Sequence, residues 1–301
     1  MTKRSKALAA IIACVIFWGF SFVSIKIAVA VFPPMTLGAL RFSLALVFLF
    51  FIKKKMAPDE KITVKDMPML AGAGLTGVTL YFFFENNGVL LIPASEASII
   101  IAAIPVITLI AEGIRDKITL KKMLLPGLGA LVSVTGVGLV AGVSFALSGT
   151  ALGYFYMAGA CVSWVVYCFL TRPLFSRHSR IFIVFWQSLA GFLGFLPFTF
   201  FETINANSAF VMPGLEVWGH VIFLGICCSA LGYWFYALSL KTLGLGTSTI
   251  FINLIPVVSA IGGYFILGDR LSPLQWFGAA LVLAGVYIAM AAQDTGQKHS
   301  A

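Results

Sequence analysis

The chain has 301 residues, of which 60% are hydrophobic and only 10% are charged, and its mean hydropathy is +1.02. Because soluble domains carry about one-quarter charged residues, this composition excludes a cytosolic enzyme, a secreted disulfide scaffold and a disordered protein. The formal net charge of +9 does not indicate a nucleic-acid partner, since the basic residues lie in short segments between apolar runs. We therefore expect the lipid bilayer to surround most of the chain.

Ten apolar runs are long enough to cross a bilayer as helices, which takes about 20 residues each. They lie at 7–30, 34–52, 67–88, 94–114, 123–143, 150–171, 181–201, 217–239, 247–267 and 274–292. The first run is longer than a signal-peptide core, so we expect it to be retained. The alternation typical of a membrane β-barrel does not recur. The sequence predicts an all-α integral membrane protein with ten transmembrane helices.

The basic residues are distributed unevenly between the two sets of loops. All 20 Lys and Arg residues fall on the side of the N-terminus except Lys26 and Arg41, which lie within spans, and Arg270, which lies in an opposite loop. Loops rich in Lys and Arg stay in the cytoplasm. The sequence therefore predicts a multi-pass protein of the cell membrane with both termini cytoplasmic.

No metal or cofactor site is expected from the Cys and His residues. The five cysteines all lie within apolar runs, at spacings that match neither a zinc site nor a redox pair, and the three histidines are scattered. We interpret the cysteines as reduced packing residues.

Two halves of the chain resemble each other at an offset of about 150 residues. The segment from Tyr81 matches the segment from Tyr233: each has an aromatic cluster and then an I-P-V inside the next span. Each ends in a turn, D-K-I-T from Asp116 and D-R-L-S from Asp269. We expect two five-helix repeats, 1–145 and 146–301. Because five is odd, the second repeat must be inverted in the membrane, as in secondary transporters.

Four short motifs, in their order along the chain, resemble one known family. They are F-W-G-F-S-F with Ile25-Lys26 in the first span, Arg41-Phe42 in the second, A-S-E-A-S before the fourth and G-D-R-L-S-P before the tenth. The chain resembles the EamA type of the drug/metabolite transporter superfamily over nearly its whole length. One departure is I-R-D-K-I-T in the first repeat, where the family usually shows L-G-E-R-L-T. The resemblance implies ten helices, a central cavity between the halves and movement of small organic molecules without ATP.

Glu85 and Glu96 are the acids within or at the mouths of spans in the first half. A carboxylate in lipid is costly and hence a functional candidate, although interfacial water could solvate both. Tyr81 precedes Glu85 by four residues and shares its helix face. The two side chains together could hold an organic cation. The second repeat has Ala237 in place of Glu85, so this site would be asymmetric.

The two cations within spans have different expected roles. Lys26 either reaches the outer interface with its ammonium or binds a substrate carboxylate while Glu85 binds the amine. Arg41 lies too deep to reach the interface, so we expect it to face the bundle and to pair with an acid such as Glu96. The outer-loop acids Glu202 and Glu216 are expected to be solvated.

Pro105 and Pro256 occupy equivalent places in the fourth and ninth spans. A mid-helix proline kinks a helix and frees a carbonyl, which suits a gate or a cavity wall. Asn253 would place a polar group near mid-membrane. The aromatic residues that could line the same cavity are Trp18, Trp164, Tyr167, Tyr233 and Trp234.

Two glycine patterns within spans are interpreted as helix contacts. The run 72–77 matches G-x-G-x-x-G but lies in an apolar helix without the strand that a dinucleotide site needs. Gly149 and Gly153 form a G-x-x-x-G, which lets helices approach closely.

The sequence favours a secondary transporter that moves amino acids or related small metabolites by alternating access, as an exporter. A carrier for organic or quaternary-ammonium cations is the second hypothesis, and a membrane scaffold or intramembrane enzyme is the third. The chain has no Walker A motif and no catalytic motif, so we expect neither an ATPase subunit nor enzyme activity.

Overall fold

The computed structural model describes residues 2–92, 97, 100–117, 120–140, 150–205, 213–262 and 272–298. Within these ranges every regular element is helical, and eight helices are long and apolar enough to cross a membrane. The fourth and ninth predicted spans are not among these eight, because their helices are shorter and are interrupted within the span. The predicted class, an all-α membrane protein of ten helices, is confirmed.

The helices of the first half follow the predicted runs closely. They are α1 (Lys3–Val29), α2 (Pro34–Met56), α3 (Met67–Gly74), the π-helical η1 (Leu75–Leu80), α4 (Tyr81–Leu91), α6 (Ile104–Arg115) and α7 (Leu120–Val140). The elements α3, η1 and α4 form one continuous span.

The second half repeats this order. Its helices are α8 (Ala151–Thr171), the 3-10 helix η2 (Arg172–Ser176), α9 (Arg180–Asn205), α10 (Leu215–Phe223), the π-helical η3 (Leu224–Leu231), α11 (Gly232–Leu243), α12 (Leu245–Ile250), η4 (Phe251–Asn253), α13 (Leu254–Gly262) and α14 (Pro273–Lys298). The elements α10, η3 and α11 again form one span.

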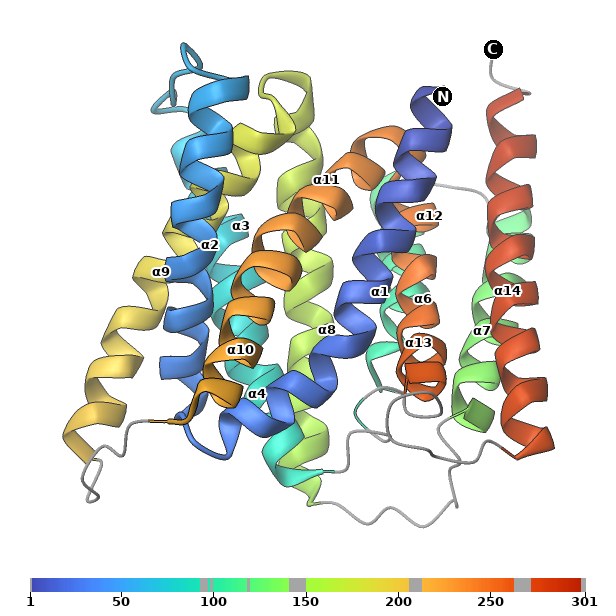
Figure 1. The fold of residues 1–301 in the computed structure, drawn as a ribbon. Coiled ribbons are helices and arrows are strands. Elements are labelled where there is room, and N and C mark those ends of the chain that lie inside the picture. Colours follow the sequence, from blue (N-terminus) through green and yellow to red (C-terminus); the bar gives the residue numbers. More distant parts are fainter. Residues whose placement is uncertain are drawn as a thin grey trace.

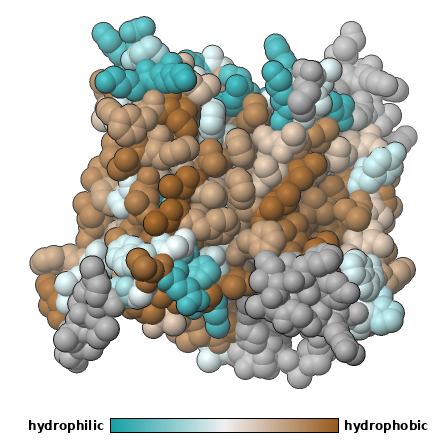
Figure 2. Space-filling model, in the orientation of Figure 1, coloured by the Kyte–Doolittle hydropathy of each residue, from teal (hydrophilic) through white to brown (hydrophobic). Residues whose placement is uncertain are grey.

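Equivalent helices of the two halves run in opposite directions (Figure 1). Helix α1 starts at the end of the bundle where α8 finishes, and the last turns of α14 return to the end where α1 began. We call this the basic end, because Lys53, Lys54 and Lys55 lie there in the last turn of α2. Figure 2 shows a hydrophobic band between hydrophilic surfaces at the two ends, as a bilayer requires.

The last helix of each half packs against the other, α7 against α14, through glycines. A Cβ at Gly129 would meet the backbone of Gly285 and Ala289, and one at Gly136 would meet that of Gly278 and Val282. The partner numbers fall as the α7 numbers rise, so the two helices are antiparallel. Small residues allow this close approach in membranes.

The glycines of the run 72–77 make helix contacts, as predicted. A Cβ at Gly74 would collide with the carbonyl of Gln187 in α9, and one at Gly77 would collide with the ring of Tyr167 in α8. Gly153 packs against Ile92 in the same way, while Gly149 lies outside the described residues. The run 72–77 leads into the π-helical turn, which the sequence did not predict.

At the basic end, polar contacts tie the first half to the second. The ring of His178 lies between two carboxylates of the α2–α3 connection, with Nδ1 2.9 Å from Glu60 Oε1 and Nε2 3.0 Å from Asp66 Oδ2. Arg177 also pairs with Asp66. At the end of α8, Arg172 Nη1 lies 3.3 Å from Glu112 Oε1 and 3.0 Å from Asp116 Oδ2.

At the opposite end Glu202 joins the last part of α9 to the start of α2. Its carboxylate accepts hydrogen bonds from the backbone amides of Met35 (2.9 Å) and Thr36 (2.7 Å) and from the Thr36 hydroxyl (2.8 Å). The prediction that Glu202 is merely solvated is therefore wrong. The first amides of a helix lack partners within the helix, and a carboxylate satisfies them and complements the helix dipole.

The α7–α14 contact yields a prediction with an internal control. In Gly136→Val the new Cβ would lie 2.6 Å from the Gly278 carbonyl oxygen and from the Val282 amide nitrogen, so α14 must shift. Overpacking of this kind costs about 1–3 kcal/mol, and we expect a lower melting temperature in detergent. Gly138→Val should change it far less, because nothing lies within 4 Å of a Cβ at that site. Equal losses in both variants would contradict this packing.

The basic-end contacts predict a pH-dependent stability. Hydrogen bonds from Thr63 and His178 and the charge of Arg177 hold the pKa of the Asp66 carboxyl below its usual value. A lowered pKa means stabilisation that is complete above the unfolded value of about 3.9 and is lost as the pH falls through the folded value. Asp66→Asn should therefore lower the melting temperature at pH 7, and the difference from wild type should shrink below about pH 4.

The exposed Asp59 provides the control for this experiment. Asp59→Asn removes the same charge from the same connection and should leave the melting temperature nearly unchanged at every pH. A wild-type advantage over Asp66→Asn that stays constant from pH 7 to pH 3 would show that the Asp66 charge does not contribute.

Candidate functional site

A cavity lies between the two halves, away from the basic end. About 470 Å³ of space free of atoms, including its opening, lies within it. Its walls are Trp18, Ser21, Phe22 and Ile25 of α1, Arg41 of α2, Tyr81, Phe82 and Glu85 of α4, Trp164 of α8, Tyr233 of α11, and Ile101, Ile104, Ile252 and Ile255 of the two interrupted spans.

Much of the wall consists of pairs of residues related by the internal repeat. The pairs are Trp18 with Trp164, Tyr81 with Tyr233, Ile101 with Ile252 and Ile104 with Ile255. Trp164 lies at the centre of the aromatic part, with ring centroids 5.3 Å from Trp18, 5.0 Å from Tyr81 and 5.7 Å from Tyr233. Tilted and edge-on contacts at these separations are the favourable ones for aromatic rings. The walls are thus largely symmetric and apolar.

Glu85 brings a carboxylate into this apolar wall. The side chain is 4% exposed, and its Oε1 accepts a 2.7 Å hydrogen bond from the hydroxyl of Tyr81, one helical turn earlier. An acid in the membrane interior is costly and in general marks a functional position. Its place in the cavity wall puts the carboxylate where a ligand would lie.

Arg41 brings a positive charge into the same cavity. It is 2% exposed; Nε donates to Ser229 Oγ in η3 at 3.3 Å, and the guanidinium lies 4.3 Å from the ring centroid of Phe82. Its Nη1 is buried and has no hydrogen-bond partner among the described residues. The predicted pairing with Glu96 is untested, because Glu96 lies outside those residues.

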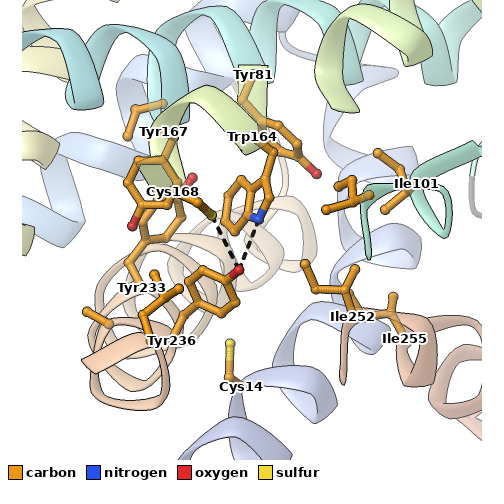
Figure 3. Packing of buried hydrophobic residues seen from close by; sticks show 14 of the residues in the cluster. Cys14, Tyr81, Ile101, Trp164, Tyr167, Cys168, Tyr233, Tyr236, Ile252 and Ile255 are labelled. Atoms are coloured by element: carbon orange, nitrogen blue, oxygen red, sulfur yellow. Dashed lines mark hydrogen bonds between the residues drawn. The ribbon is translucent and has the colours of Figure 1, made fainter. Parts of the chain in front are cut away.

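The cavity is closed toward the basic end by a buried layer of side chains, which we call the floor. Each floor residue lies about one turn nearer the basic end than a wall residue of its helix: Cys14 below Trp18, Cys168 below Trp164, and Tyr236 below Tyr233. Trp164 Nε1 donates to the Tyr236 hydroxyl at 3.3 Å, and Cys168 Sγ lies 3.5 Å from it (Figure 3). All three floor residues are fully buried, so a ligand could reach the basic end from the cavity only after the helices move.

Three residues predicted for the cavity do not line it in this conformation. Tyr167 is buried behind Trp164, with ring centroids 5.0 Å apart. Trp234 is half-buried and stacks on Phe235. Asn253 donates from Nδ2 to Ser133 Oγ at 3.0 Å and has a buried, unpartnered Oδ1. Their roles stay predictions.

The residues predicted for structure or gating are placed differently from one another. Lys26 is exposed and is not part of the cavity wall. Pro105 is the second residue of α6 and Pro256 the third of α13. In each span a new helix begins just before the proline, so the span is interrupted there and not merely kinked. Each proline therefore lies in the first turn of a helix, where a backbone N–H has no partner within the helix.

Several wall residues escaped the sequence analysis although their pattern was visible. Ser21, Phe22 and Ile25 follow Trp18 at spacings of three, four and seven, which is one helix face. Ile104 and Ile255 directly precede the two prolines. Within the described residues, no group of three or more His, Cys, Asp or Glu side chains could hold a metal ion.

Comparison with known proteins agrees with this architecture. The model of the EamA-like transporter family matches residues 5–142 and again residues 151–291. An uncharacterized transporter of Archaeoglobus fulgidus is 30% identical, over 91% of this chain and 95% of its own. A protein known from a crystal structure aligns with a TM-score of 0.77 at 20% identity, over 97% of this chain and 99% of that one, which supports the fold.

Two further relatives have names that state a substrate class. A probable terminal-alkyne amino-acid exporter of Streptantibioticus cattleyicolor is 26% identical, over 95% of this chain and 94% of its own. A probable amino-acid metabolite efflux pump of Escherichia coli is 25% identical, over 96% and 95%. With two family matches that together cover nearly the whole chain, the protein belongs to the EamA-like transporter family and is a membrane transporter, not an enzyme.

Proposed function

We propose that the protein is a secondary transporter that exports amino acids or closely related small metabolites across the cell membrane. The observation that carries this proposal is the presence of Glu85 and Arg41, a buried carboxylate and a buried guanidinium, in the wall of one cavity. An amino acid carries the complementary pair of charges. Its ammonium would bind at Glu85 and its carboxylate at the free Nη1 of Arg41, which is able to donate a charge-assisted hydrogen bond.

The second hypothesis, an organic-cation carrier, is less well supported by the same cavity. Glu85 and the surrounding rings suit a cation, but a ligand without a carboxylate would leave the Arg41 donor unpaired. Leaving a buried donor without a partner costs about 1–3 kcal/mol, and more for a charged group. Export as the direction is supported by the names of two relatives.

Transport would follow alternating access between the inverted halves. If the basic end faces the cytoplasm, as its lysines and arginines indicate, the described conformation is closed on the cytoplasmic side by the floor. Loading an exporter then requires the floor to open and the contacts of Arg172 and His178 to break. The cavity would close toward the other side in the same movement.

The charges of the cavity can be tested by counterflow in proteoliposomes, with an amino acid and with the amine that lacks its carboxylate. Arg41→Gln should lower amino-acid counterflow at least tenfold, or about 1.4 kcal/mol, and reduce the preference for amino acid over amine. Glu85→Gln should slow both solutes. Lys26→Gln, which removes a charge outside the cavity wall, should leave both rates within about twofold, since exposed charges contribute little.

Two outcomes would count against this proposal. If wild type carried the amine as fast as the amino acid, and Arg41→Gln changed neither rate, the organic-cation hypothesis would replace it. If no amino acid or amine in a broad panel gave counterflow, while the protein remained folded by its melting curve, both assignments would fail.

The orientation can be tested with reporter fusions in a bacterial host. We expect green fluorescent protein to fluoresce, and alkaline phosphatase to be inactive, at both the N-terminus and the C-terminus, because both should be cytoplasmic. A phosphatase fused after Thr150, just before α8, should be active and serves as the control. Active phosphatase at either terminus would reject the proposed orientation.

A further inference from the structure

A second hollow lies on the outer surface of the bundle, between α2 and α9, and is separate from the cavity. Its walls are Leu46, Val47, Phe50 and Phe51 of α2 and Phe185 and Leu189 of α9. We call it the α2–α9 groove. All six side chains are apolar, and Val47 and Phe51 are 61% and 65% exposed. A surface of this kind within a bilayer is in contact with acyl chains.

A cluster of cations lies at the basic end of the α2–α9 groove. The Lys53 ammonium lies 5.6 Å from the ring centroid of Phe182 and 5.8 Å from that of Phe185, which is a groove residue. Lys54 and Lys55 follow in the last turn of α2 and are exposed. Among the described residues, no carboxylate lies within 4 Å of any of the three ammonium groups.

The apolar groove and the three lysines at its end together fit one class of molecule. Aliphatic and aromatic side chains lie at the depth of the acyl chains, and three successive cations lie at the depth where α2 ends, which is the headgroup level. Anionic lipid headgroups bind to such juxtamembrane lysines with about 1 kcal/mol per Lys or Arg. We propose that the α2–α9 groove binds an anionic phospholipid, with an acyl chain along Phe50 and Phe51 and its phosphate at Lys53.

A second copy of the chain fits the groove less well. In a two-fold symmetric dimer formed through this face, the same surface patch meets itself, so the lysines of both copies would face each other at one bilayer level. Like charges placed together in this way are unfavourable. An anionic lipid neutralises the same lysines.

A bound lipid would also act on the packing of the two halves. Helix α2 belongs to the first half and α9 to the second, and Glu202 joins them at the opposite end. A lipid in the groove would contact both helices near the basic end. Binding to the folded state alone stabilises it, so lipid binding should appear as a higher melting temperature.

The test uses the purified full-length protein in a neutral detergent, with phosphatidylglycerol or phosphatidylcholine added at equal concentrations. Native mass spectrometry counts bound lipid, and the melting temperature reports stabilisation. Wild type should retain phosphatidylglycerol in preference and should be stabilised more by it. The triple variant K53Q/K54Q/K55Q should bind phosphatidylglycerol at least tenfold more weakly and lose most of its preference.

The matched control is K3Q/R4Q/K6Q, which removes three positive charges from the start of α1 at the same end. It should keep the wild-type preference, because these charges are not at the groove. A further variant, Val47→Trp, fills the groove and should weaken retention of both lipids without changing the charge. Glycerol phosphate, a headgroup without chains, should not stabilise the protein.

Several results would overturn the proposal. Equal loss in the two triple variants would indicate general attraction of anionic lipid to a basic protein. Equal retention of both lipids by wild type would exclude recognition of charge, and full stabilisation by glycerol phosphate would indicate a simple phosphate site. A lipid-independent dimer that Val47→Trp dissociates would assign the groove to a second copy.

Discussion

The cost of placing a charge among apolar groups is the constraint on which this structure depends. Lipid offers no hydrogen bonds, so the backbone must be helical, and a charged side chain within a span must turn inward or reach an interface. Glu85 and Arg41 are both nearly fully buried, and each is held by a neighbour, Tyr81 and Ser229 respectively. Both side chains also line the cavity, where they could interact with a bound solute. The position of the site thus follows from the same physics that makes the chain a membrane protein.

The cavity combines a symmetric wall with asymmetric charges. Repeat-related aromatic and isoleucine pairs come from both halves, so either half can contribute the same surface when the helices move. Glu85, by contrast, has Ala237 at its equivalent position in the second repeat. In the proposed mechanism a symmetric wall could close in two equivalent ways, as alternating access requires, whereas the unique charges would give a bound solute one orientation. Movement and recognition would therefore depend on different residues.

Much of this arrangement could be predicted from the sequence, because hydropathy, charge asymmetry and an internal repeat depend on residue type alone. The ten spans and four aromatic residues of the cavity wall, Trp18, Tyr81, Trp164 and Tyr233, followed from them, whereas Phe22 and Phe82 did not. The π-helical turns did not; η1 lies beside the close contacts of Gly74 with α9 and of Gly77 with α8, which depend on tertiary packing. The role of Glu202 could not be foreseen either, since its partners are backbone amides about 166 residues away. The neighbours of Arg41 likewise depend on the crossing of α2 with η3.

The basic end and the α7–α14 interface are held by different kinds of contact, and this difference bears on how the protein would open. The basic end is held in part by ion pairs at the surface, such as Arg172 with Asp116, whose side chains are 47% and 36% exposed. Ion pairs at a surface contribute little individually, because water competes for each group. Breaking these exposed pairs costs correspondingly little, so they would hinder opening of this end less than its buried contacts do. The α7–α14 contact, by contrast, is made by backbones in close apposition, and interfaces packed this tightly do not deform gradually. We therefore expect α7 and α14 to move as one unit while the helices that carry the floor rearrange beside them.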